Sequence, residues 1–232
     1  MLSRLLELVF PERCPACQAL TQHLGLCGTC ALSLYPTAPA CPVCALPGRA
    51  EVTCSRCRLR PPPWRTVRAP YRYGGELAKA IRRFKWGGTQ GGRPELARPL
   101  GKLLAPALTA IEVDVIVPVP LHRLRVRERG FSQALALALA ARGFAGLTAP
   151  VIPGLLERRR ATPEQAGLGR TAREQNVAGA FVVPDLAGVR GKHVLLVDDV
   201  ITTGATAAAC ARVLRSAGAA EITVAALARA EM

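Results

Sequence analysis

The sequence contains no long uninterrupted apolar run, although half of its 232 residues are hydrophobic. Its apolar stretches end well short of the roughly 20 residues that a membrane-spanning helix needs. The opening segment, 1–11, is split by Glu7 and lacks a small-residue cleavage site, so it does not have the pattern of a secretory signal. We therefore predict a cytoplasmic protein without an integral membrane segment. The opening segment is predicted to be a short amphipathic helix, which leaves open a peripheral contact at the inner face of the membrane.

Aromatic and acidic residues are also scarce. Aromatic residues make up 4% of the chain, and 16 acidic residues stand against 31 lysines and arginines, which gives a formal charge of +15. The excess lies in residues 61–100, with a net charge of +7, and in residues 120–175, with +6. Such an imbalance favours anionic partners, either phosphate groups or a nucleic-acid backbone. An arginine-rich composition without a function is the alternative, but clusters such as Arg158–Arg160 favour a function.

Cysteine, in contrast, is abundant and regularly spaced. Eight of the nine cysteines form four Cys-x-x-Cys pairs, Cys14/Cys17, Cys27/Cys30, Cys41/Cys44 and Cys54/Cys57. Two such turns complete a tetrahedral Zn²⁺ site, so we predict two structural zinc ions. A disulfide framework is the rival interpretation, but it belongs to oxidising compartments. The spacing does not fix which pairs share a metal. The simplest assignment joins the first pair with the second, and the third with the fourth.

The cysteine pairs also suggest the domain organisation. They are separated by 9, 10 and 9 residues, which indicates a duplicated unit, and residues 1–60 are predicted to form a double zinc ribbon. This module has so few aromatic residues that it would lack a core without metal. Three prolines stiffen segment 61–70 into a spacer, and residues 71–232 are predicted to form the second domain. The ninth cysteine, Cys210, lies among alanine and valine and is predicted to be a buried small hydrophobic residue.

Residues 194–206 carry the most informative pattern of the chain. Val194–Val197 suits a strand that is buried on both faces of a parallel sheet. Asp198 and Asp199 follow at its carboxyl end, where open α/β sheets bind ligands. A turn that opens a helix comes next, and it consists of Thr202, Thr203, Gly204, Ala205 and Thr206. Small side chains, threonine hydroxyls and a helix N-terminus favour phosphate, and the carboxylates can hold ribose hydroxyls or a Mg²⁺ shell. The pattern predicts a site for a sugar with a 5′-phosphate, against the alternative of an ordinary strand and capped helix.

The rest of the chain alternates strands with helices. Strands are predicted at Tyr71–Tyr73, on an edge, and at Val113–Val117, Val194–Val197 and Glu221–Ala226. Helices are predicted at Glu76–Trp86, Pro94–Ala110 and Gln133–Ala141, and from the phosphate turn to about Arg215. The predicted fold class is therefore α/β, with a parallel sheet of about five strands flanked by helices. The cations Arg82, Arg83 and Lys85 end the first of these helices and are candidates for binding nucleic acid, unless they only form a solvated face.

Two segments predicted as loops carry the remaining chemistry. In the first, Leu121–Gly130, an extended backbone would place the arginines at positions 123, 125, 127 and 129 in one row, suited to phosphate oxygens. Pro118 and Pro120 stiffen the entrance to this loop. The second, Arg158–Asn176, is long and polar, which is typical of a mobile lid or a binding loop.

Together these motifs resemble those of known proteins. Residues 194–206 resemble the phosphoribosyl-pyrophosphate (PRPP) motif of type I phosphoribosyltransferases, and nearly the whole chain resembles the ComF family of competence proteins and their GntX-like relatives. The resemblance implies a type I phosphoribosyltransferase fold attached to a zinc module. It also implies that Asp198 and Asp199 bind the ribose hydroxyls, Thr202–Thr206 the 5′-phosphate, and the loop with Pro120 and Arg129 the pyrophosphate.

The family resemblance also bears on cofactors and partners. It implies PRPP with Mg²⁺ as ligand, single-stranded DNA as partner in DNA uptake, and a helicase-like partner in DNA import. Arg173 is the first choice for the basic residue that the lid would supply to catalysis. Thr202 stands where transferases of 6-oxopurines have an aspartate, and no base-recognition segment is evident. The sequence therefore predicts a competence protein that handles single-stranded DNA and has a phosphoribosyl pocket. An active Mg²⁺-dependent phosphoribosyltransferase acting on an unidentified acceptor is the alternative.

Overall fold

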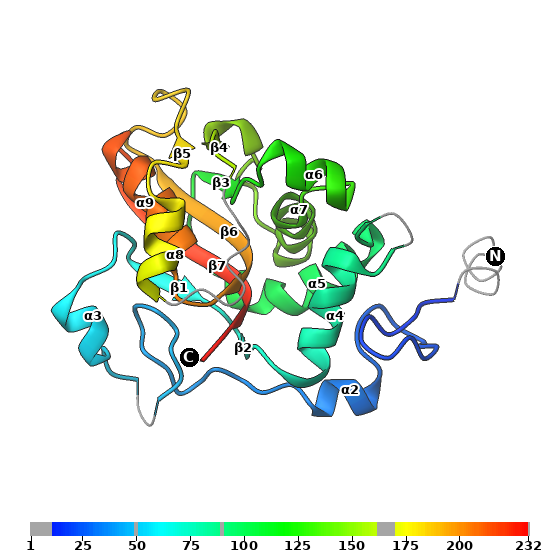
Figure 1. The fold of residues 1–232 in the computed structure, drawn as a ribbon. Coiled ribbons are helices and arrows are strands. Elements are labelled where there is room, and N and C mark those ends of the chain that lie inside the picture. Colours follow the sequence, from blue (N-terminus) through cyan, green and yellow to red (C-terminus); the bar gives the residue numbers. More distant parts are fainter. Residues whose placement is uncertain (1–10, 49–50, 89–90, 162–169, 232) are drawn as a thin grey trace.

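A computed structural model describes residues 11–48, 51–88, 91–161 and 170–231. The helix expected in the opening segment lies outside these ranges, except for its last residue. The described chain forms an α/β fold around one parallel sheet, as the sequence predicts (Figure 1). Four strands follow the order β1-β7-β6-β3, and β2 also pairs with β7. The strands are β1 (Thr66–Arg68), β2 (Tyr71–Arg72), β3 (Val115–Pro118), β6 (His193–Ile201) and β7 (Glu221–Arg229).

Helices cover both faces of this sheet. The helices of the α/β domain are α4 (Gly75–Trp86), α5 (Ala97–Leu104), α6 (Arg123–Arg129), α7 (Gln133–Ala145), α8 (Arg170–Val177) and α9 (Ala205–Ser216). Short 3-10 helices, Pro94–Leu96 and Ala105–Leu108, flank α5, so the helix expected over 94–110 has three parts. Ser132 begins α7, and its hydroxyl accepts a hydrogen bond from the backbone N–H of Leu135.

The central strands are buried on both faces because their side chains alternate between two apolar clusters. Val194 and Leu196 of β6 pack with α9 on one face. Leu195 and Val197 pack with α4, α5 and α7 on the other. Cys210 of α9 is fully buried in the apolar cluster on the α9 face of the sheet, which confirms the prediction that it is a small core residue. The run of apolar residues at 194–197 is therefore explained by burial on two sides.

Strand β6 is longer than its apolar run. It continues through Asp198 and Asp199 to Ile201, because β7 runs beside it and supplies backbone partners up to the pair Ile201 and Arg229. The neighbour on the other side, β3, ends where Pro118 pairs with Val197. The two carboxylates thus lie on the part of β6 that extends beyond β3, at the carboxyl edge of the sheet.

Three segments contain regular structure that the sequence did not predict. Segment 121–130, expected to be extended, contains α6. This helix begins at His122, whose ring accepts the N–H of Leu124, and ends at Gly130, whose φ of +79° favours glycine. The expected lid, 158–176, begins in an antiparallel pair, β4 (Glu157–Arg158) with β5 (Phe181–Val182), and ends in α8, while residues 162–169 lie outside the described ranges. Within the expected spacer, Thr66–Arg68 forms β1 and pairs with β7.

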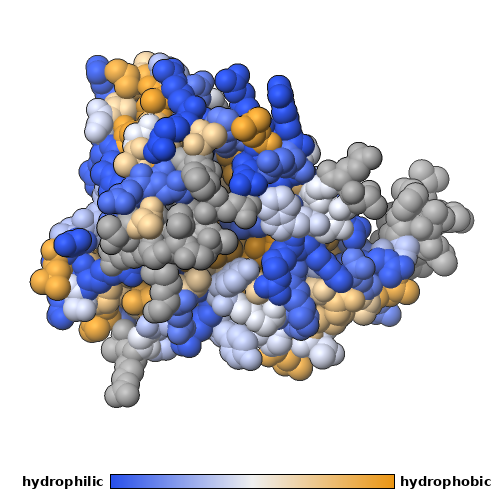
Figure 2. All heavy atoms as spheres, viewed as in Figure 1, coloured by the Kyte–Doolittle hydropathy of each residue, from blue (hydrophilic) through white to orange (hydrophobic). Residues whose placement is uncertain are grey.

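The N-terminal cysteine-rich segment lies along the α/β domain rather than apart from it (Figure 1). Its two short helices are α2 (Gly28–Leu32) and α3 (Ser55–Leu59). The first part packs on α4 and α5, because Cys14, Ala16, Leu26 and Cys30 belong to the same apolar cluster as Leu77 and Ile81. Figure 2 shows that polar side chains dominate the visible face, with apolar residues scattered among them.

Candidate functional site

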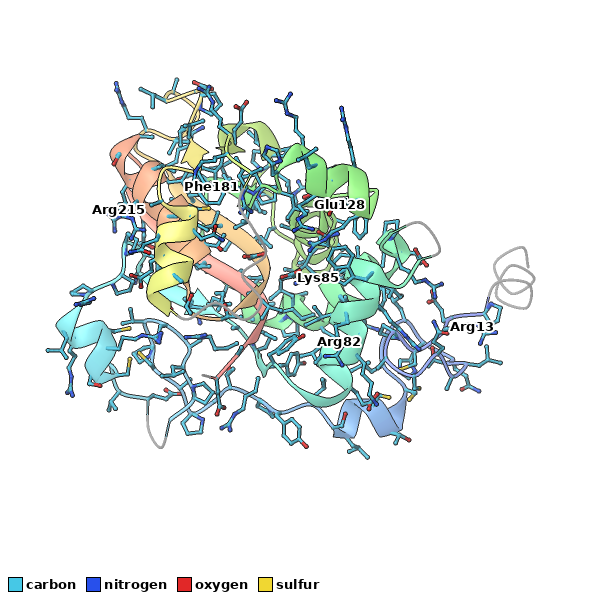
Figure 3. The ribbon with its side chains drawn as sticks, viewed as in Figure 1. Arg13, Arg82, Lys85, Glu128, Phe181 and Arg215 are labelled. Carbon is cyan, nitrogen blue, oxygen red and sulfur yellow. The ribbon has the colours of Figure 1, made fainter. Side chains whose placement is uncertain are left out.

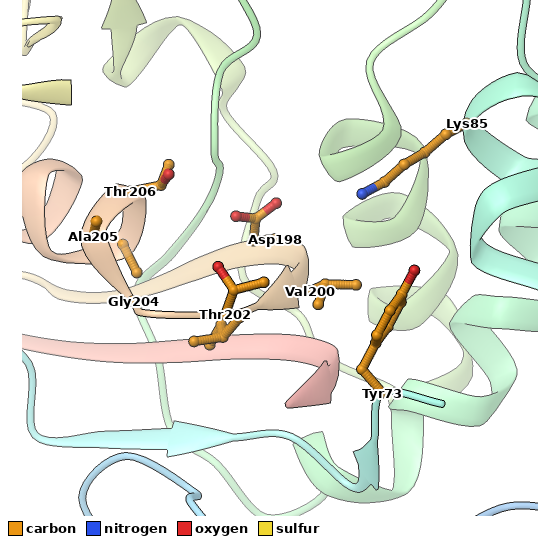
Figure 4. Close-up of a pocket in the computed structure, with 10 residues that line it drawn as sticks. Tyr73, Lys85, Asp198, Val200, Thr202, Gly204, Ala205 and Thr206 are labelled. Carbon is orange, nitrogen blue, oxygen red and sulfur yellow. The ribbon is translucent and has the colours of Figure 1, made fainter. Parts of the chain in front are cut away.

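The turn after β6 forms a loop suited to phosphate. Gly204 has a φ of +82°, a left-handed conformation that favours glycine, and directly precedes α9. The Thr203 hydroxyl accepts a hydrogen bond from the N–H of Ala205 at 3.1 Å. A cavity of about 280 Å³ lies at this turn, and Figure 4 shows Thr202, Gly204, Ala205 and Thr206 along its wall. We call residues 202–206 the phosphate loop, because a helix N-terminus with small residues favours an anion.

Asp198 and Asp199 lie beside this loop but differ in their surroundings. Asp198 lines the cavity described above, which we call the sugar cavity, and its Oδ1 accepts the backbone N–H of Asp199 at 2.8 Å. Burial and the neighbouring Asp199 charge raise the pKa of Asp198 to about 7. Asp199 is 8% exposed and lines a second, wider cavity. The two carboxylates of the motif are therefore not equivalent.

Asp199 is paired with a lysine from a distant segment. The Lys85 Nζ, near the end of α4, lies 2.8 Å from Asp199 Oδ2. Burial disfavours the ammonium, but the attraction of Asp199 outweighs it, so the pKa of Lys85 is raised and the lysine stays charged. Figure 4 shows Lys85 pointing from α4 toward Asp198, with the Tyr73 ring nearby. Lys85 lines the sugar cavity and also the wider cavity beside it, and its role in binding nucleic acid stays a prediction.

The wider cavity has a volume of about 670 Å³ and adjoins the sugar cavity. Four residues line both, namely Tyr73, Lys85, Asp198 and Thr206. The remaining wall is rich in arginine and contains Arg82, Arg125, Arg129 and Arg158, together with Trp86 and Pro120. We call this second space the arginine cavity. Figure 3 shows Arg82 and Lys85 on the same helix, on the side that faces the centre of the view.

The arginine row expected at 123–129 is not formed, because a helix does not place alternate residues on one face. Arg125 and Arg129, four residues apart and hence on one face, line the arginine cavity. Arg129 donates to Gln133 Oε1 at 3.0 Å, and its guanidinium lies 4.2 Å from the centroid of the Trp86 ring. Pro120 lines the same cavity, at the carboxyl edge after β3. The segment with Pro120 and Arg129 therefore does reach the site, in a different conformation.

Two further arginines that the sequence suggested as site residues, Arg83 and Arg173, do not line either cavity as far as the structure describes them. Arg83, the neighbour of Arg82, points to the cysteine-rich segment, where its Nη1 donates to the backbone oxygen of Ala16 at 2.6 Å. Of the three cations at the end of α4, Arg82 and Lys85 thus line the arginine cavity, whereas Arg83 faces the cysteine-rich segment. Arg173 belongs to α8, but its side chain lies outside what the structure describes. Its catalytic role stays a prediction.

The eight paired cysteines form two clusters. In each cluster, the four Sγ atoms lie within 4.8 Å of one another. The first cluster consists of Cys14, Cys17, Cys27 and Cys30, and the second cluster consists of Cys41, Cys44, Cys54 and Cys57. This grouping confirms the simplest assignment of pairs. The Sγ–Sγ distance is 3.6 Å for Cys17 and Cys27 and 3.8 Å for Cys44 and Cys54. These sulfur–sulfur distances suit four sulfurs arranged as a tetrahedron around zinc, with zinc–sulfur bonds of about 2.3 Å.

In each cluster one thiol ionises more readily than an isolated cysteine, whereas burial raises the pKa of Cys30 and Cys57. Burial opposes ionisation of Cys14 and Cys41, but hydrogen bonds from backbone N–H groups outweigh it and lower their pKa to about 6 and about 7. The thiolate is the form that binds zinc. All nine cysteines are free of disulfide bonds. The two tetracysteine sites therefore fit two structural zinc ions.

Sequence reasoning missed three residues of this region. Tyr73 follows the edge strand β2 and lines the sugar cavity. The only sign of this in the sequence is an aromatic residue at the carboxyl end of a strand. Trp86 is 45% exposed beside Arg129, and it ends a basic helix. Arg229 is 2% exposed although it is charged, and the signal was a single arginine in the apolar run of β7. Its contacts are described below.

These features define a protein that joins two tetracysteine zinc ribbons to a phosphoribosyltransferase-type α/β fold. Comparison with known families agrees, because residues 5–58 match the double zinc ribbon domain and residues 135–231 match the phosphoribosyl transferase domain. The chain is 33% identical to the DNA utilization protein YhgH of Salmonella typhi, over 94% of this chain and 96% of that protein. It is 31% identical to Competence protein F of Haemophilus influenzae, over 94% of this chain and 90% of that protein. The chain belongs to the ComF family.

Among solved structures, the chain is similar to a glutamine PRPP amidotransferase from B. subtilis in complex with ADP and GMP. The two share 29% identity over 56% of this chain and 25% of that one, with a TM-score of 0.39. Within the described ranges, every helix is too short or too polar to span a lipid bilayer. The family relationship supports a competence-related role for the chain.

Proposed function

We propose that this protein binds a phosphoribosyl ligand in the sugar cavity and single-stranded DNA along the arginine cavity, in a competence-related role. PRPP fits the first part best, because its 5′-phosphate suits the phosphate loop and its ribose hydroxyls suit the carboxyl of Asp198. Its pyrophosphate would extend toward Arg129 and the segment at Pro120 in the adjoining cavity. The helicase-like partner and the role of Arg173 in closing over the ligand belong to the same proposal.

One observation carries the proposal, namely that the cavity at the phosphate loop and Asp198 shares part of its wall with a cavity rich in arginine. A sugar hydroxyl needs an acceptor such as Asp198, whereas phosphate oxygens need arginine forks. A sugar that carries phosphates at both ends meets both needs within one continuous space. The exposed Trp86 at the wider end adds an aromatic surface on which a base can stack.

The residues also fit a magnesium ion bound together with PRPP. Mg²⁺ in such sites uses one or two carboxylates and the phosphate oxygens of the substrate. Asp198 lines both cavities and supplies a carboxylate oxygen at their junction, while Asp199 is held by Lys85. When bound, the ion would neutralise charge on the pyrophosphate. Lys85 holds the second carboxylate in place and keeps positive charge beside it.

The DNA part is tested by anisotropy with a labelled oligonucleotide at several salt concentrations. The variant Arg82→Gln/Arg125→Gln removes two cations from the arginine cavity, and Arg98→Gln removes an exposed arginine of α5 as the matched control. Binding by the double variant should weaken, and the slope of log affinity against log salt should become shallower by about 1.4, because each lost phosphate contact contributes about 0.7. An unchanged slope in the double variant would contradict DNA binding at this surface.

An active phosphoribosyltransferase is the second candidate, and the size of the arginine cavity favours it. Its volume of about 670 Å³ leaves room for an acceptor next to the ribose, where pyrophosphate would leave from C1. The wild-type protein mixed with PRPP, Mg²⁺ and a set of nucleobases should then release pyrophosphate. Release that persists in Asp198→Ala would assign the reaction to a contaminant, and no release with any base would leave ligand binding as the function of the pocket.

A further inference from the structure

The second cluster lies against the back of the phosphate loop, and Arg229 links the two. This arginine ends β7 and is 2% exposed. Its Nε donates to the backbone oxygen of Cys44 at 3.0 Å. Its Nη1 donates to the backbone oxygen of Ile201 at 2.9 Å and to that of Thr202. One guanidinium thus joins the metal-binding turn to the start of the phosphate loop.

Two more side chains make the same connection. Arg56, which lies between Cys54 and Cys57, donates from Nη2 to the backbone oxygen of Thr203 at 3.5 Å. Trp64 donates from Nε1 to the backbone oxygen of Val43 at 2.9 Å. The Trp64 ring also faces Gly204 so closely that a Cβ added to this glycine would lie 3.2 Å from it. Three side chains, Arg229, Arg56 and Trp64, therefore link the phosphate loop to the second cluster.

This link depends on the metal, because the second cluster has little core of its own. Its buried apolar residues are Cys41, Cys44 and Cys57, with Val43, Leu46 and Cys54 packed around them. A segment whose core consists mainly of metal ligands is ordered by binding the metal. Without zinc, the backbone oxygens of Cys44 and Val43 would no longer be held where Arg229 and Trp64 reach them.

The first cluster is attached elsewhere. Its backbone accepts hydrogen bonds from Arg83 of α4, at Ala16, and from Lys102 of α5, at Leu24, with distances of 2.6 and 3.1 Å. The two clusters are therefore chemically alike but support different parts of the molecule. This difference offers an internal control that separates a local effect on the phosphate loop from a general loss of metal.

We propose that zinc in the second cluster, but not zinc in the first, sets the conformation of the phosphate loop. Arg229 and Arg56 are then positioning residues for phosphoribosyl binding, and loss of zinc from the second cluster weakens that binding. The identity of the ligand rests on the function proposed above, whereas the conformation of the loop does not.

The test compares Cys54→Ser with Cys27→Ser in the full-length protein. The two cysteines are the third ligands of their clusters, and both are partly exposed. Metal analysis should show a fall from two zinc ions per chain to one in each variant. Hydrogen exchange at the amides of residues 202–206 should accelerate at least tenfold in Cys54→Ser and less than twofold in Cys27→Ser. Calorimetry should show at least tenfold weaker PRPP binding in Cys54→Ser only.

Equal effects in the two variants, or an unchanged loop in Cys54→Ser, would overturn the proposal. If the wild-type protein does not bind PRPP, the proposed function fails, and the exchange rates alone still decide this inference.

A second pair of variants leaves the metal ligands intact. Arg229→Gln should keep two zinc ions and lose PRPP affinity at least tenfold, with Arg229→Lys between it and the wild type. Arg142→Gln, which removes a half-buried arginine bonded to the backbone oxygens of Thr148 and Ala149, should not change PRPP affinity. Equal loss in Arg229→Gln and Arg142→Gln would contradict a positioning role.

Discussion

The sugar cavity and the arginine cavity lie side by side at the carboxyl edge of the sheet, yet they are built differently. The smaller one is lined mainly by one continuous stretch, within residues 198–207, with two residues from elsewhere, Tyr73 and Lys85. The larger one collects arginines from α4, α6 and β4, which are far apart in the sequence. A compact motif suits a small, fixed ligand, whereas dispersed cations suit an extended anion. On the proposed function, the sugar and its 5′-phosphate occupy the smaller cavity, whereas the larger one receives the pyrophosphate and a polynucleotide.

The largest expected effect is a loss of PRPP binding without a loss of DNA binding. Asp198→Ala removes the acceptor for the ribose hydroxyls, and each hydrogen bond to a charged group contributes about 1.5–3 kcal/mol. PRPP affinity should fall about hundredfold by calorimetry, while affinity for single-stranded DNA should not fall. The control is Asp185→Ala, which removes an exposed aspartate that bonds to the backbone N–H of Ala187. Unchanged PRPP affinity in Asp198→Ala would contradict the assignment of the sugar cavity.

The second prediction concerns Lys85, which lines both cavities. Lys85→Met leaves Asp199 largely buried without its partner, so we expect a loss of about 2 kcal/mol in the free energy of unfolding, measured with urea. Lys79→Met, on the same helix, breaks the exposed pair with Glu76 and should cost much less, because solvent screens that pair. The double variant Lys85→Met/Asp199→Asn should regain most of the loss. Equal stability of the two lysine variants would show that Lys85 is not a structural counter-ion.

The third prediction is a pH dependence confined to the sugar cavity. The pKa of Asp198 is raised to about 7, so the folded chain holds this proton more tightly than the unfolded chain. Its contribution to stability is therefore lost as pH rises from the ordinary value of 3.8 through about 7. Ligand binding needs the carboxylate, so the affinity for PRPP with Mg²⁺ should rise about tenfold between about pH 6 and 8. In Asp198→Asn, only the change due to the titration of PRPP itself should remain. An identical pH profile of PRPP affinity in both proteins would contradict the assignment of this titration to Asp198.

The smallest effect concerns the aromatic part of the arginine cavity. Trp86→Ala should weaken binding of single-stranded DNA about fivefold, because stacking contributes about 1–3 kcal/mol per base and Arg129 already covers part of the ring. The slope of affinity against salt should not change, since no charge is removed. Anisotropy at several salt concentrations measures both quantities. A changed slope with unchanged affinity at low salt would point to an electrostatic role for this region rather than stacking.

The sequence predicted the parts of the site that are local. The motif at 194–206 and the four cysteine pairs carry their geometry in short spacings, so the buried strand, the turn that opens α9 and both cysteine clusters could be predicted. The alternation of strands and helices likewise gave the parallel sheet. These features follow from the periodicity of burial and from the short reach of a turn.

What the sequence did not predict depends on contacts between distant segments. Lys85 looked like a surface cation, because the carboxylate that pairs with it lies 114 positions later in the chain. Segment 121–130 looked extended because arginines alternate in it, yet His122 and Gly130 supply the ends of a helix. Arg229 gave only the signal of one charge in an apolar strand, and one of its partners, Cys44, lies in the distant cysteine-rich segment. Such pairings arise only when the sheet brings its carboxyl edge together.

The most direct test of the account is a calorimetric titration of the wild-type protein with PRPP, with and without Mg²⁺. We expect saturable binding of one PRPP per chain, stronger with Mg²⁺ than without it, and weaker binding of ribose 5-phosphate, which lacks the pyrophosphate. No heat of binding at millimolar PRPP in the presence of Mg²⁺, from a protein that retains its two zinc ions, would contradict a phosphoribosyl site at the carboxyl edge of β6.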